Sequence, residues 1–247
     1  MNKIVLMCLL LLGTLTLNTA AASVTVTVKQ EQYVFKHKPL LVEVLAPIAA
    51  QENWYWPMAA LYQEGDIQLD KTRQSLLNNL SALIKRYQTE KPQIGQSIKQ
   101  LKATIASWRI ARRLPVKIDY DLARIVAAAN PRLPKGNYIL DLSPRMDTVQ
   151  LFGAVNKTSY MPHLAHADAS EYITRQTLTN LANKDIVMII QADGREITTP
   201  VAYWNRTHQE VMPGSQVFVP FKESLFHPEF ALINQQIITL ALNRVRS

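Results

Sequence analysis

Residues 70–108 read DKTRQSLLNNLSALIKRYQTEKPQIGQSIKQLKATIASW, and this stretch determines the fold more clearly than any other. Its apolar residues recur every three or four positions, as on one face of an α-helix. Lys91-Pro92 interrupts the pattern, because proline cannot continue a preceding helix. We therefore predict two helices that form an antiparallel hairpin. The residues that define their apolar faces are Leu76, Leu80, Leu83, Tyr87, Ile94, Ile98, Leu101, Ile105 and Trp108.

Strand patterns lie on both sides of the hairpin. Alternation of apolar and polar residues predicts strands with one buried face. The predicted strands around the hairpin span 24–28, 32–36, 116–118, 122–126 and 138–142, with a helix over 39–50. A second set spans 147–152, 186–190, 196–199 and 216–220, with a short helix capped by Asp168. This repeated order indicates two small α+β units, the second from about Met146 to Phe221.

Residues 227–247 predict a C-terminal amphipathic helix with Phe230, Ile233 and Ile237 on its apolar stripe. Arg244 and Arg246 suit the negative C-terminal end of a helix dipole. The stretch is too polar and too short to predict a membrane span. We favour a helix docked on its own domain, and the alternative is a surface helix that contacts a partner or a membrane.

The N-terminus has the three parts of a secretory signal. Lys3 precedes an apolar run over 4–12, and small residues end at Ala22. We therefore predict that residues 1–22 are a signal peptide cleaved near Ala22. Cys8 is the only cysteine, so the mature chain has no disulfide and no cysteine-ligated metal. An exported chain of about 225 residues without disulfides fits a bacterial periplasm.

The composition is basic. Removal of residues 1–22 takes away one lysine and no acid, so the formal net charge falls from +8 to +7. Such a charge favours anionic partners, for example phospholipid, acidic glycan or an acidic protein surface. Export and the dispersed basic residues argue against nucleic acid, since Arg112-Arg113 is the one adjacent pair of arginines.

The sequence contains none of the common short motifs of catalytic or cofactor sites. The sequence has no GxSxG elbow, P-loop or dinucleotide-binding glycine pattern, and only seven glycines. His163 and His166 lack the glutamate of an HExxH metal site. Asp119 and Asp121 fit turn caps better than a glycosidase pair. We therefore expect no enzyme activity, no metal and no cofactor.

Two groups of residues are candidates for ligand contact, each with a structural alternative. The aromatic residues Trp54, Tyr55, Trp56, Tyr62 and Trp204 could stack on sugars, although we favour a place in the core. Arg112 and Arg113 could hold a carboxylate or sulfate through two parallel hydrogen bonds, or form surface ion pairs. His208 could act as a base, but a single histidine in a loop is more often a hydrogen-bonding partner.

An ordered set of short motifs covers nearly the whole mature chain and resembles the GfcC-like capsule biosynthesis family. They are Trp56-Pro57, RLPVKID over 113–119, PKGNY over 134–138, VQLFGAV over 149–155, PVAYWN over 200–205, His208 and PGSQ over 213–216. Arg113 matches the arginine of the family's Arg-Leu-Pro-Val motif. Arg112 departs from the pattern, which has glycine there, and this bears on the shape and charge of that pocket.

The resemblance implies a fold of two β-grasp domains with an inserted helical hairpin. The expected parts are a signal peptide over 1–22, a first β-grasp domain over 23–145 with the hairpin at about 69–110, a second β-grasp domain over 146–226, and the C-terminal amphipathic helix over 227–247. The fold is similar to domains of outer-membrane polysaccharide exporters, whose glycine strand and Pro-Gly turn correspond here to Gly153 and Pro213-Gly214.

The resemblance also implies a function. We expect a non-enzymatic periplasmic accessory protein in assembly or export of capsule, O-antigen capsule or exopolysaccharide. Its partners would be a polysaccharide or the export machinery, through Arg113, Trp56, Trp204 and His208. The alternatives are a carbohydrate-modifying or cleaving enzyme of the envelope, and a scaffold that binds an outer-membrane exporter through its C-terminal helix.

Overall fold

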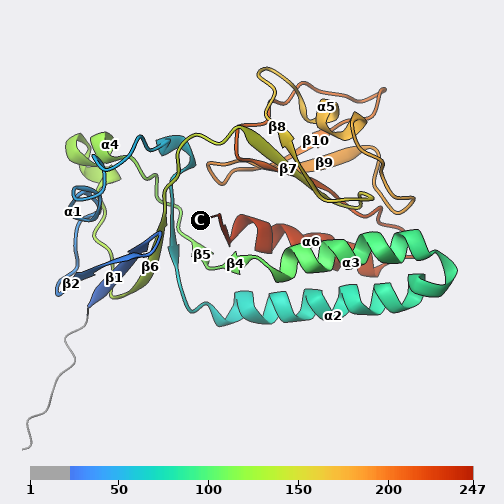
Figure 1. Ribbon diagram of the computed structural model, residues 1–247, viewed down its shortest axis with the longest axis horizontal. Coiled ribbons are helices and arrows are strands. Elements are labelled where there is room, and N and C mark those ends of the chain that lie inside the picture. The colour runs from blue at the N-terminus through green and yellow to red at the C-terminus, as the bar shows by residue number, and fades with distance from the viewer. Residues whose placement is uncertain (1–22, 247) are drawn as a thin grey trace, which may run out of the picture.

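The computed structural model of the protein describes residues 23–246, so the predicted signal peptide lies outside the described residues. The described chain is a mixed α+β structure in which two five-stranded sheets are connected through a layer of long helices (Figure 1). No helix within residues 23–246 has both the length and the apolar character needed to span a bilayer.

The first sheet has the strand order β2-β1-β6-β3-β5. Strands β1 and β6 are parallel and the other neighbours are antiparallel. Valines at alternate positions of β1 are buried, because one face packs on α1 and α4. The bounds are β1 (Val24–Val28), β2 (Glu31–Phe35), α1 (Leu41–Leu45), β3 (Ala60–Gln63), β5 (Arg112–Arg113), α4 (Tyr120–Ile125) and β6 (Gly136–Asp141).

The second sheet repeats this arrangement. Its order is β8-β7-β11-β9-β10, in which the first strand, β7, is parallel to the last, β11, and every other pair is antiparallel. Each sheet therefore has an initial strand pair, a central last strand and a further antiparallel pair. The bounds are β7 (Thr148–Gly153), β8 (Ser159–Pro162), α5 (Ala169–Thr174), β9 (Ile186–Ile190), β10 (Glu196–Pro200) and β11 (Gln216–Val219).

The predicted helical hairpin is confirmed as α2 (Ile67–Glu90) and α3 (Pro92–Ala106). The Asp66 side chain begins α2 by accepting hydrogen bonds from the backbone N–H groups of Gln68 and Leu69, which no residue within the helix can satisfy. Pro92 begins α3, where its missing N–H costs nothing. In the sequence, the hairpin lies between β3 and β5. The corresponding strands of the second sheet, β9 and β10, are joined only by a turn.

The hairpin belongs to the first unit in sequence but packs on the second. Its apolar face shares one core with β7, β9, β11 and the C-terminal helix α6 (Glu229–Leu242). Trp108 meets Phe152 of β7 edge to face, with 5.5 Å between the ring centroids. The Ser97 hydroxyl lies 3.3 Å from the Asn156 carbonyl oxygen, which further attaches α3 to the second unit.

Three sequence predictions in the first unit are wrong. Residues 116–118 are not a strand, and residues 122–126 mostly belong to α4. The Asp119 side chain explains the second error, since it accepts a hydrogen bond from Leu122 N and so begins a helix. The helix expected over 39–50 is confined to Leu41–Leu45, because Pro47 cannot donate to a carbonyl one turn earlier.

The C-terminal helix is docked on its own protein, as one of the two sequence alternatives predicted. Its apolar residues Phe230, Ile233 and Ile237 are buried in the core of the second unit. The helix ends at Leu242, however, so Arg244 and Arg246 do not lie at a helix terminus as predicted. Arg244–Val245 instead forms the short strand β12, which pairs with β4 (Arg109–Ile110).

Candidate functional site

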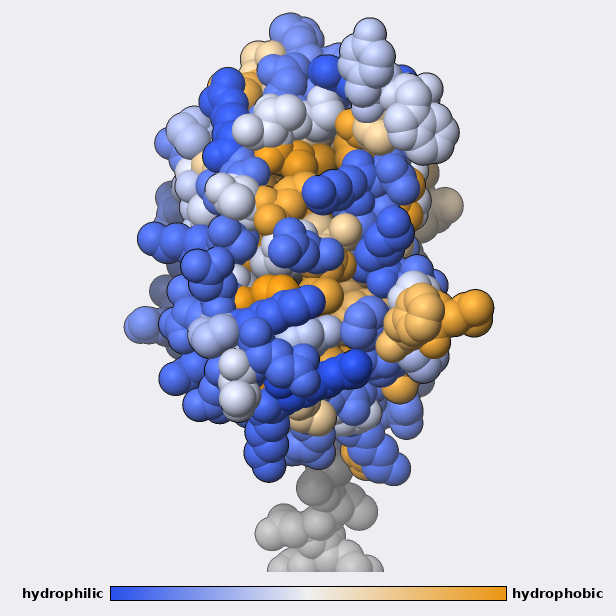
Figure 2. All heavy atoms as spheres, turned by 90° about the vertical axis from the view of Figure 1, so that its right-hand side faces the viewer, coloured by the Kyte–Doolittle hydropathy of each residue, from blue (hydrophilic) through white to orange (hydrophobic). Residues whose placement is uncertain are grey.

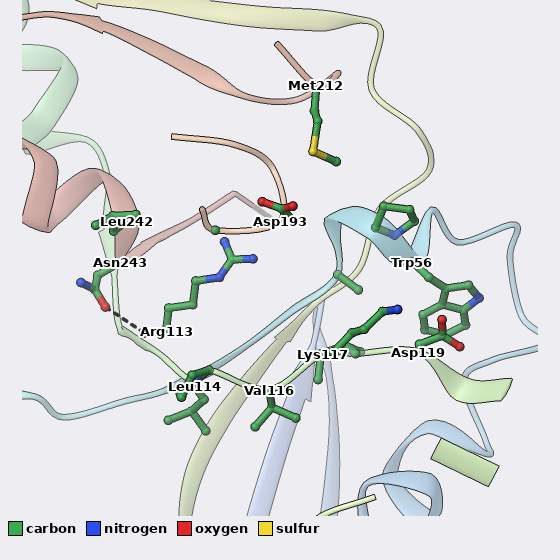
Figure 3. Close-up of a pocket in the computed structure, with 15 residues that line it drawn as sticks. Trp56, Arg113, Leu114, Val116, Lys117, Asp119, Asp193, Met212, Leu242 and Asn243 are labelled. Atoms are coloured by element: carbon green, nitrogen blue, oxygen red, sulfur yellow. Dashed lines mark hydrogen bonds between the residues drawn. The ribbon is translucent and has the colours of Figure 1, made fainter. Parts of the chain in front are cut away.

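A cavity of about 630 Å³ lies between the two sheet units. Figure 3 shows the Arg113 side chain extending toward the turn that carries Asp193, with Trp56 and Lys117 on the side away from Asn243. The cavity therefore contains the segment 113–119, which the sequence singled out, and the β9–β10 turn of the second unit. Its full lining is Trp56, Pro57, Ala59, Arg113, Leu114, Pro115, Val116, Lys117, Ile118, Asp119, Asp193, Gly194, Met212, Leu242 and Asn243.

Arg113 is held in place through its backbone. Strand β5 pairs with β3 so that Arg113 lies opposite Tyr62. The Arg113 N–H donates to the Asn243 side-chain oxygen at 2.8 Å, and Leu114 N donates to Leu61 O at 2.8 Å. A two-residue strand is thus attached on both sides, to the first sheet and to the C-terminal segment.

The guanidinium of Arg113 lies against the second unit. Nη2 donates to the Ala192 carbonyl at 3.3 Å. A Cβ at Gly194, whose φ is +94°, would lie 2.6 Å from Arg113 Nε. This glycine therefore lets the turn approach the guanidinium closely, with a backbone conformation that other residues rarely adopt. The centroid of the Tyr62 ring lies 5.9 Å from Arg113 Cζ.

Burial dominates the electrostatics of Arg113 and lowers its pKa from the ordinary value. The nearby charge of Arg246 acts in the same direction, whereas Tyr62, Asp141 and Asp193 act against it. An arginine remains protonated in spite of such a shift. Among the described residues, no carboxylate oxygen lies within 4.0 Å of either the Arg113 or the Lys117 side chain. The cavity therefore contains two cations that are not paired with an acid.

Both acidic side chains in the cavity wall bind groups other than Arg113 and Lys117. The Asp193 carboxylate lies 2.6 Å from Arg195 Nε, and Asp119 caps α4 through Leu122 N. The sequence predicted turn caps at Asp119 and Asp121; Asp119 does cap an element, but it is helix α4, and Asp121 lies in the first turn of that helix and pairs with Arg124. An anionic ligand could approach Arg113 and Lys117 and gain charge-assisted hydrogen bonds.

The rest of the cavity wall is largely apolar. Trp56 lies half-buried in the short 3₁₀ helix η1 (Trp56–Met58), and Val116 and Met212 contribute further apolar surface. Pyranose rings have apolar faces that pack on such surfaces. Cations beside an apolar wall form a site that can bind a sugar bearing a carboxylate or sulfate group.

Arg112, the departure from the family pattern, does not alter this cavity. Adjacent residues of a strand point to opposite faces, so Arg112 is exposed and contacts the Gln63 and Asp66 side chains instead. The structure places the two adjacent arginines in different surroundings. Arg113 lines the cavity and Arg112 forms surface contacts.

The aromatic candidates do not form one surface. Trp54 and Tyr62 are buried, as predicted for core residues, and Trp54 Nε1 donates to Ile48 O at 2.9 Å. Trp56 lines the Arg113 cavity. Trp204 is 76% exposed and lies on the loop that follows β10, outside the cavity.

His208 also lies apart from the Arg113 cavity. Its ring nitrogens are 4.0 Å from an Asp168 oxygen and 3.7 Å from a Glu210 oxygen. His163 contacts the Val211 carbonyl through Nε2, and His166 lies beside Glu210. Within residues 23–246, no group of three histidine, cysteine or acidic side chains is arranged to hold a metal.

Sequence reasoning missed two residues that organise the site. Asn243 anchors the Arg113 backbone, and Arg246 donates to Ala192 O at 3.0 Å, next to the Arg113 guanidinium. One signal was present in the sequence. Asp141 is the single charged residue in the apolar run over 138–142, and a buried carboxylate requires a cation. Arg246 supplies that cation at 3.5 Å.

The fold and the cavity together define a two-sheet α+β protein with a cationic site between its units. Comparison with known families is consistent with the sequence motifs. The family model described as Capsule biosynthesis GfcC, N-terminal matches residues 19–145, and the model described as Capsule biosynthesis GfcC C-terminal matches residues 157–246. The chain belongs to the GfcC capsule biosynthesis family. It is also similar to the Escherichia coli (strain K12) protein named Uncharacterized protein YjbG, with 28% identity over 193 residues and 78% of each chain covered.

Proposed function

We propose that this chain is a non-enzymatic periplasmic accessory protein that acts in the assembly or export of a capsule, O-antigen capsule or exopolysaccharide. Family membership implies a capsule-related role. The observation that carries the proposal is the Arg113 guanidinium, which lines a cavity with largely apolar walls and has no carboxylate oxygen within 4.0 Å among residues 23–246. Such a site suits an acidic sugar of the polymer.

We further propose that each sheet unit is a β-grasp domain. The support is the strand order, in which the last strand lies centrally, parallel to the first, and between two antiparallel pairs. The same order in both units fits two copies of one domain. The helical hairpin then occupies the β3–β5 connection of the first copy.

An enzyme of the envelope is the second candidate. It would need an acid and a base at the cavity, and Asp193 and Asp119 are the acids in its wall. Both accept hydrogen bonds from other groups, namely Arg195 and Leu122 N. Their engagement favours a binding role over general acid–base catalysis, which requires a carboxyl free to exchange a proton with substrate.

The third candidate is a scaffold that binds an exporter, or a membrane, through the C-terminal helix. The apolar side chains of α6 are buried against the second sheet and α2. Binding through that stripe would require the helix to leave the core. We therefore favour contact with the polysaccharide through the cavity.

The experiment uses the two adjacent arginines as test and control. The gene is deleted from the bacterium that encodes it, and the strain is complemented with wild type, Arg113→Gln or Arg112→Gln. We expect deletion to reduce the surface polysaccharide and raise the periplasmic fraction, and we expect Arg113→Gln not to restore the wild-type ratio. Arg112→Gln, which changes the same charge outside the cavity, should restore it.

Surface and periplasmic polysaccharide unchanged by the deletion would contradict the proposed function. Equal restoration by both variants would contradict the role of the cavity. The amount of folded protein is checked by immunoblot and by thermal unfolding, since a misfolded variant would also fail. Cell fractionation and mass measurement of the mature N-terminus test the location, with a start within a residue or two of Ser23 expected in the periplasmic fraction.

A further inference from the structure

The outer side of the helical hairpin carries a second cavity that is distinct from the Arg113 cavity. It has a volume of about 500 Å³ and lies along the groove between α2 and α3. Three lysines line it, Lys85 from α2 and Lys99 and Lys102 from α3. Most apolar residues of both helices face the opposite side, toward the core of the second unit, but Ile84 lines the groove. This lysine groove is therefore accessible, and most of its exposed lining is apolar.

The hairpin carries most of the excess charge of the chain. Between positions 67 and 106 there are seven basic residues and two acidic ones, a net +5 out of +8 for the whole sequence. Helix α3 contains no acidic residue. Figure 2 views the molecule toward the closed end of the hairpin, and its lower half, at the height of α2 and α3 in Figure 1, is mostly hydrophilic.

The three lysines are not neutralised within the described chain. No carboxylate of residues 23–246 lies within 4.0 Å of their ammonium groups. Lys85 and Lys99 are exposed, and Lys102 is half-buried with its Nζ donating to Ser81 Oγ at 2.7 Å. Lys99 and Lys102 are three positions apart, so they lie next to each other on α3. The groove thus concentrates positive charge without internal acids.

The other lining groups indicate which kind of anion fits. Gln88 and Gln96 supply two amides, which can both donate to and accept from sugar hydroxyls, whereas the Ser81 hydroxyl already donates to Leu77 O and accepts from Lys102 Nζ. Ile84 and Pro92 belong to a lining whose exposed surface is mostly apolar, so a sugar ring could pack on it. The exposed apolar residues Leu225 and Phe226, which could enter a lipid surface, do not line the groove. This chemistry favours an acidic polysaccharide over a membrane.

We infer that the lysine groove between α2 and α3 binds an acidic polysaccharide, independently of the Arg113 cavity. This inference rests on the proposed function, because it assumes that the chain meets an envelope polymer. A polysaccharide bound both in the lysine groove and in the Arg113 cavity would follow the surface of the hairpin between them. The groove would hold the polymer through its carboxylate or sulfate groups, and its affinity would fall with increasing salt.

The test measures the binding of an oligogalacturonate of about ten residues to the full mature chain by calorimetry. The Arg113→Gln variant is the background, so that binding which persists there is assigned to the groove. The added changes are Lys85→Gln, Lys99→Gln and Lys102→Gln together. The matched control is Lys36→Gln, Lys38→Gln and Lys71→Gln, which removes the same charge from exposed positions outside the groove.

We expect the groove variant to weaken the affinity at least tenfold and the control to weaken it less than threefold. Both should unfold near the wild-type temperature, since five of the six substituted lysines are exposed and the half-buried Lys102 loses only its hydrogen bond to Ser81 Oγ. Equal loss in both variants, or unchanged affinity in the groove variant, would overturn the inference. Equal affinity for neutral dextran would also overturn it, and so would equally strong, lysine-dependent binding to phosphatidylglycerol vesicles.

Failure of this inference is distinguishable from failure of the proposed function. If the groove variant binds normally while Arg113→Gln still fails to restore surface polysaccharide, only the groove is excluded. If the groove binds oligogalacturonate while deletion of the gene leaves the polysaccharide unchanged, the binding site stands and the export role does not.

Discussion

Arg246 and Asp141 form a buried ion pair in which Arg246 Nε lies 3.5 Å from the Asp141 carboxylate, with side chains that are 10% and 3% exposed. The backbone N–H of Arg246 donates to the same oxygen at 3.1 Å. The guanidinium also donates to Met58 O in the first unit and Ala192 O in the second. The C-terminal segment thus joins both units at the edge of the Arg113 cavity.

Arg246→Ala should destabilise the protein strongly. Removal of the guanidinium leaves the Asp141 carboxylate buried without its partner, which typically costs about 3–5 kcal/mol. Chemical denaturation measures the free energy of unfolding. Arg124→Ala, which breaks an exposed pair with Asp121, is the control and should change it by less than about 1 kcal/mol.

The double variant Asp141→Leu, Arg246→Met should lose less stability than Arg246→Ala, because it leaves no charge unpaired. A loss from Arg246→Ala as small as that of the exposed control would show that Asp141 does not depend on this cation.

Gly194→Ala should displace the Arg113 guanidinium. Its Cβ would lie 2.6 Å from Arg113 Nε, and the φ of +94° adds a backbone cost of about 1–2 kcal/mol. Gly65→Ala is the control, since Gly65 has a φ of +82° but no atom within 4 Å of an added Cβ. Both variants should lose stability, whereas only Gly194→Ala should also reduce the Arg113-dependent surface polysaccharide. A normal polysaccharide ratio with Gly194→Ala would argue against the importance of the guanidinium position.

Asp168 should make stability depend on acid pH. Burial alone would raise the pKa of this carboxyl, but hydrogen bonds from Ser170 and Arg206 outweigh burial and leave the pKa below its ordinary value. A lowered folded pKa means that the stabilisation is present above about pH 5 and is lost as the pH falls through the folded value. Urea unfolding between pH 6 and pH 3 should therefore show a steeper loss for wild type than for Asp168→Asn.

The asparagine variant keeps a side-chain oxygen that can cap α5, so the comparison isolates the charge. Asp121→Asn, at an exposed carboxylate, should leave the wild-type slope unchanged. Parallel curves for wild type and Asp168→Asn would contradict the role of the Asp168 carboxylate.

The sequence predicted those parts of the fold that depend on local pattern. The hairpin was predictable because its apolar spacing and Pro92 act within one segment, and Asp168 marked the start of α5 because a cap bonds to its own neighbours. Residues 122–126 were misassigned because alternation of apolar residues also fits one helical turn. Here the cap at Asp119 decided the outcome.

The site was predictable only in part, because folding brings its members together. The family motif pointed to Arg113, and Trp56 lines the same cavity, but Trp204 and His208 lie elsewhere. No local pattern connects Arg113 to Asn243, which lies 130 positions away in the sequence. Such contacts follow from the packing of the units.

The last helix shows how polar residues can mislead, and it leads to a further prediction. Asn234 and Gln236 interrupt the apolar character of the helix in the sequence, yet both are buried. The Asn234 amide pairs with the Phe221 backbone, accepting from its N–H at 2.9 Å and donating to its carbonyl at 2.8 Å.

Asn234→Leu would leave both backbone groups buried and unpaired, at a cost of about 2–5 kcal/mol. Gln235→Leu, at the adjacent exposed position, should change the free energy of unfolding by less than about 0.5 kcal/mol. Chemical denaturation of the two variants therefore tests whether α6 is part of the core, and similar small effects would indicate a helix only loosely attached to it.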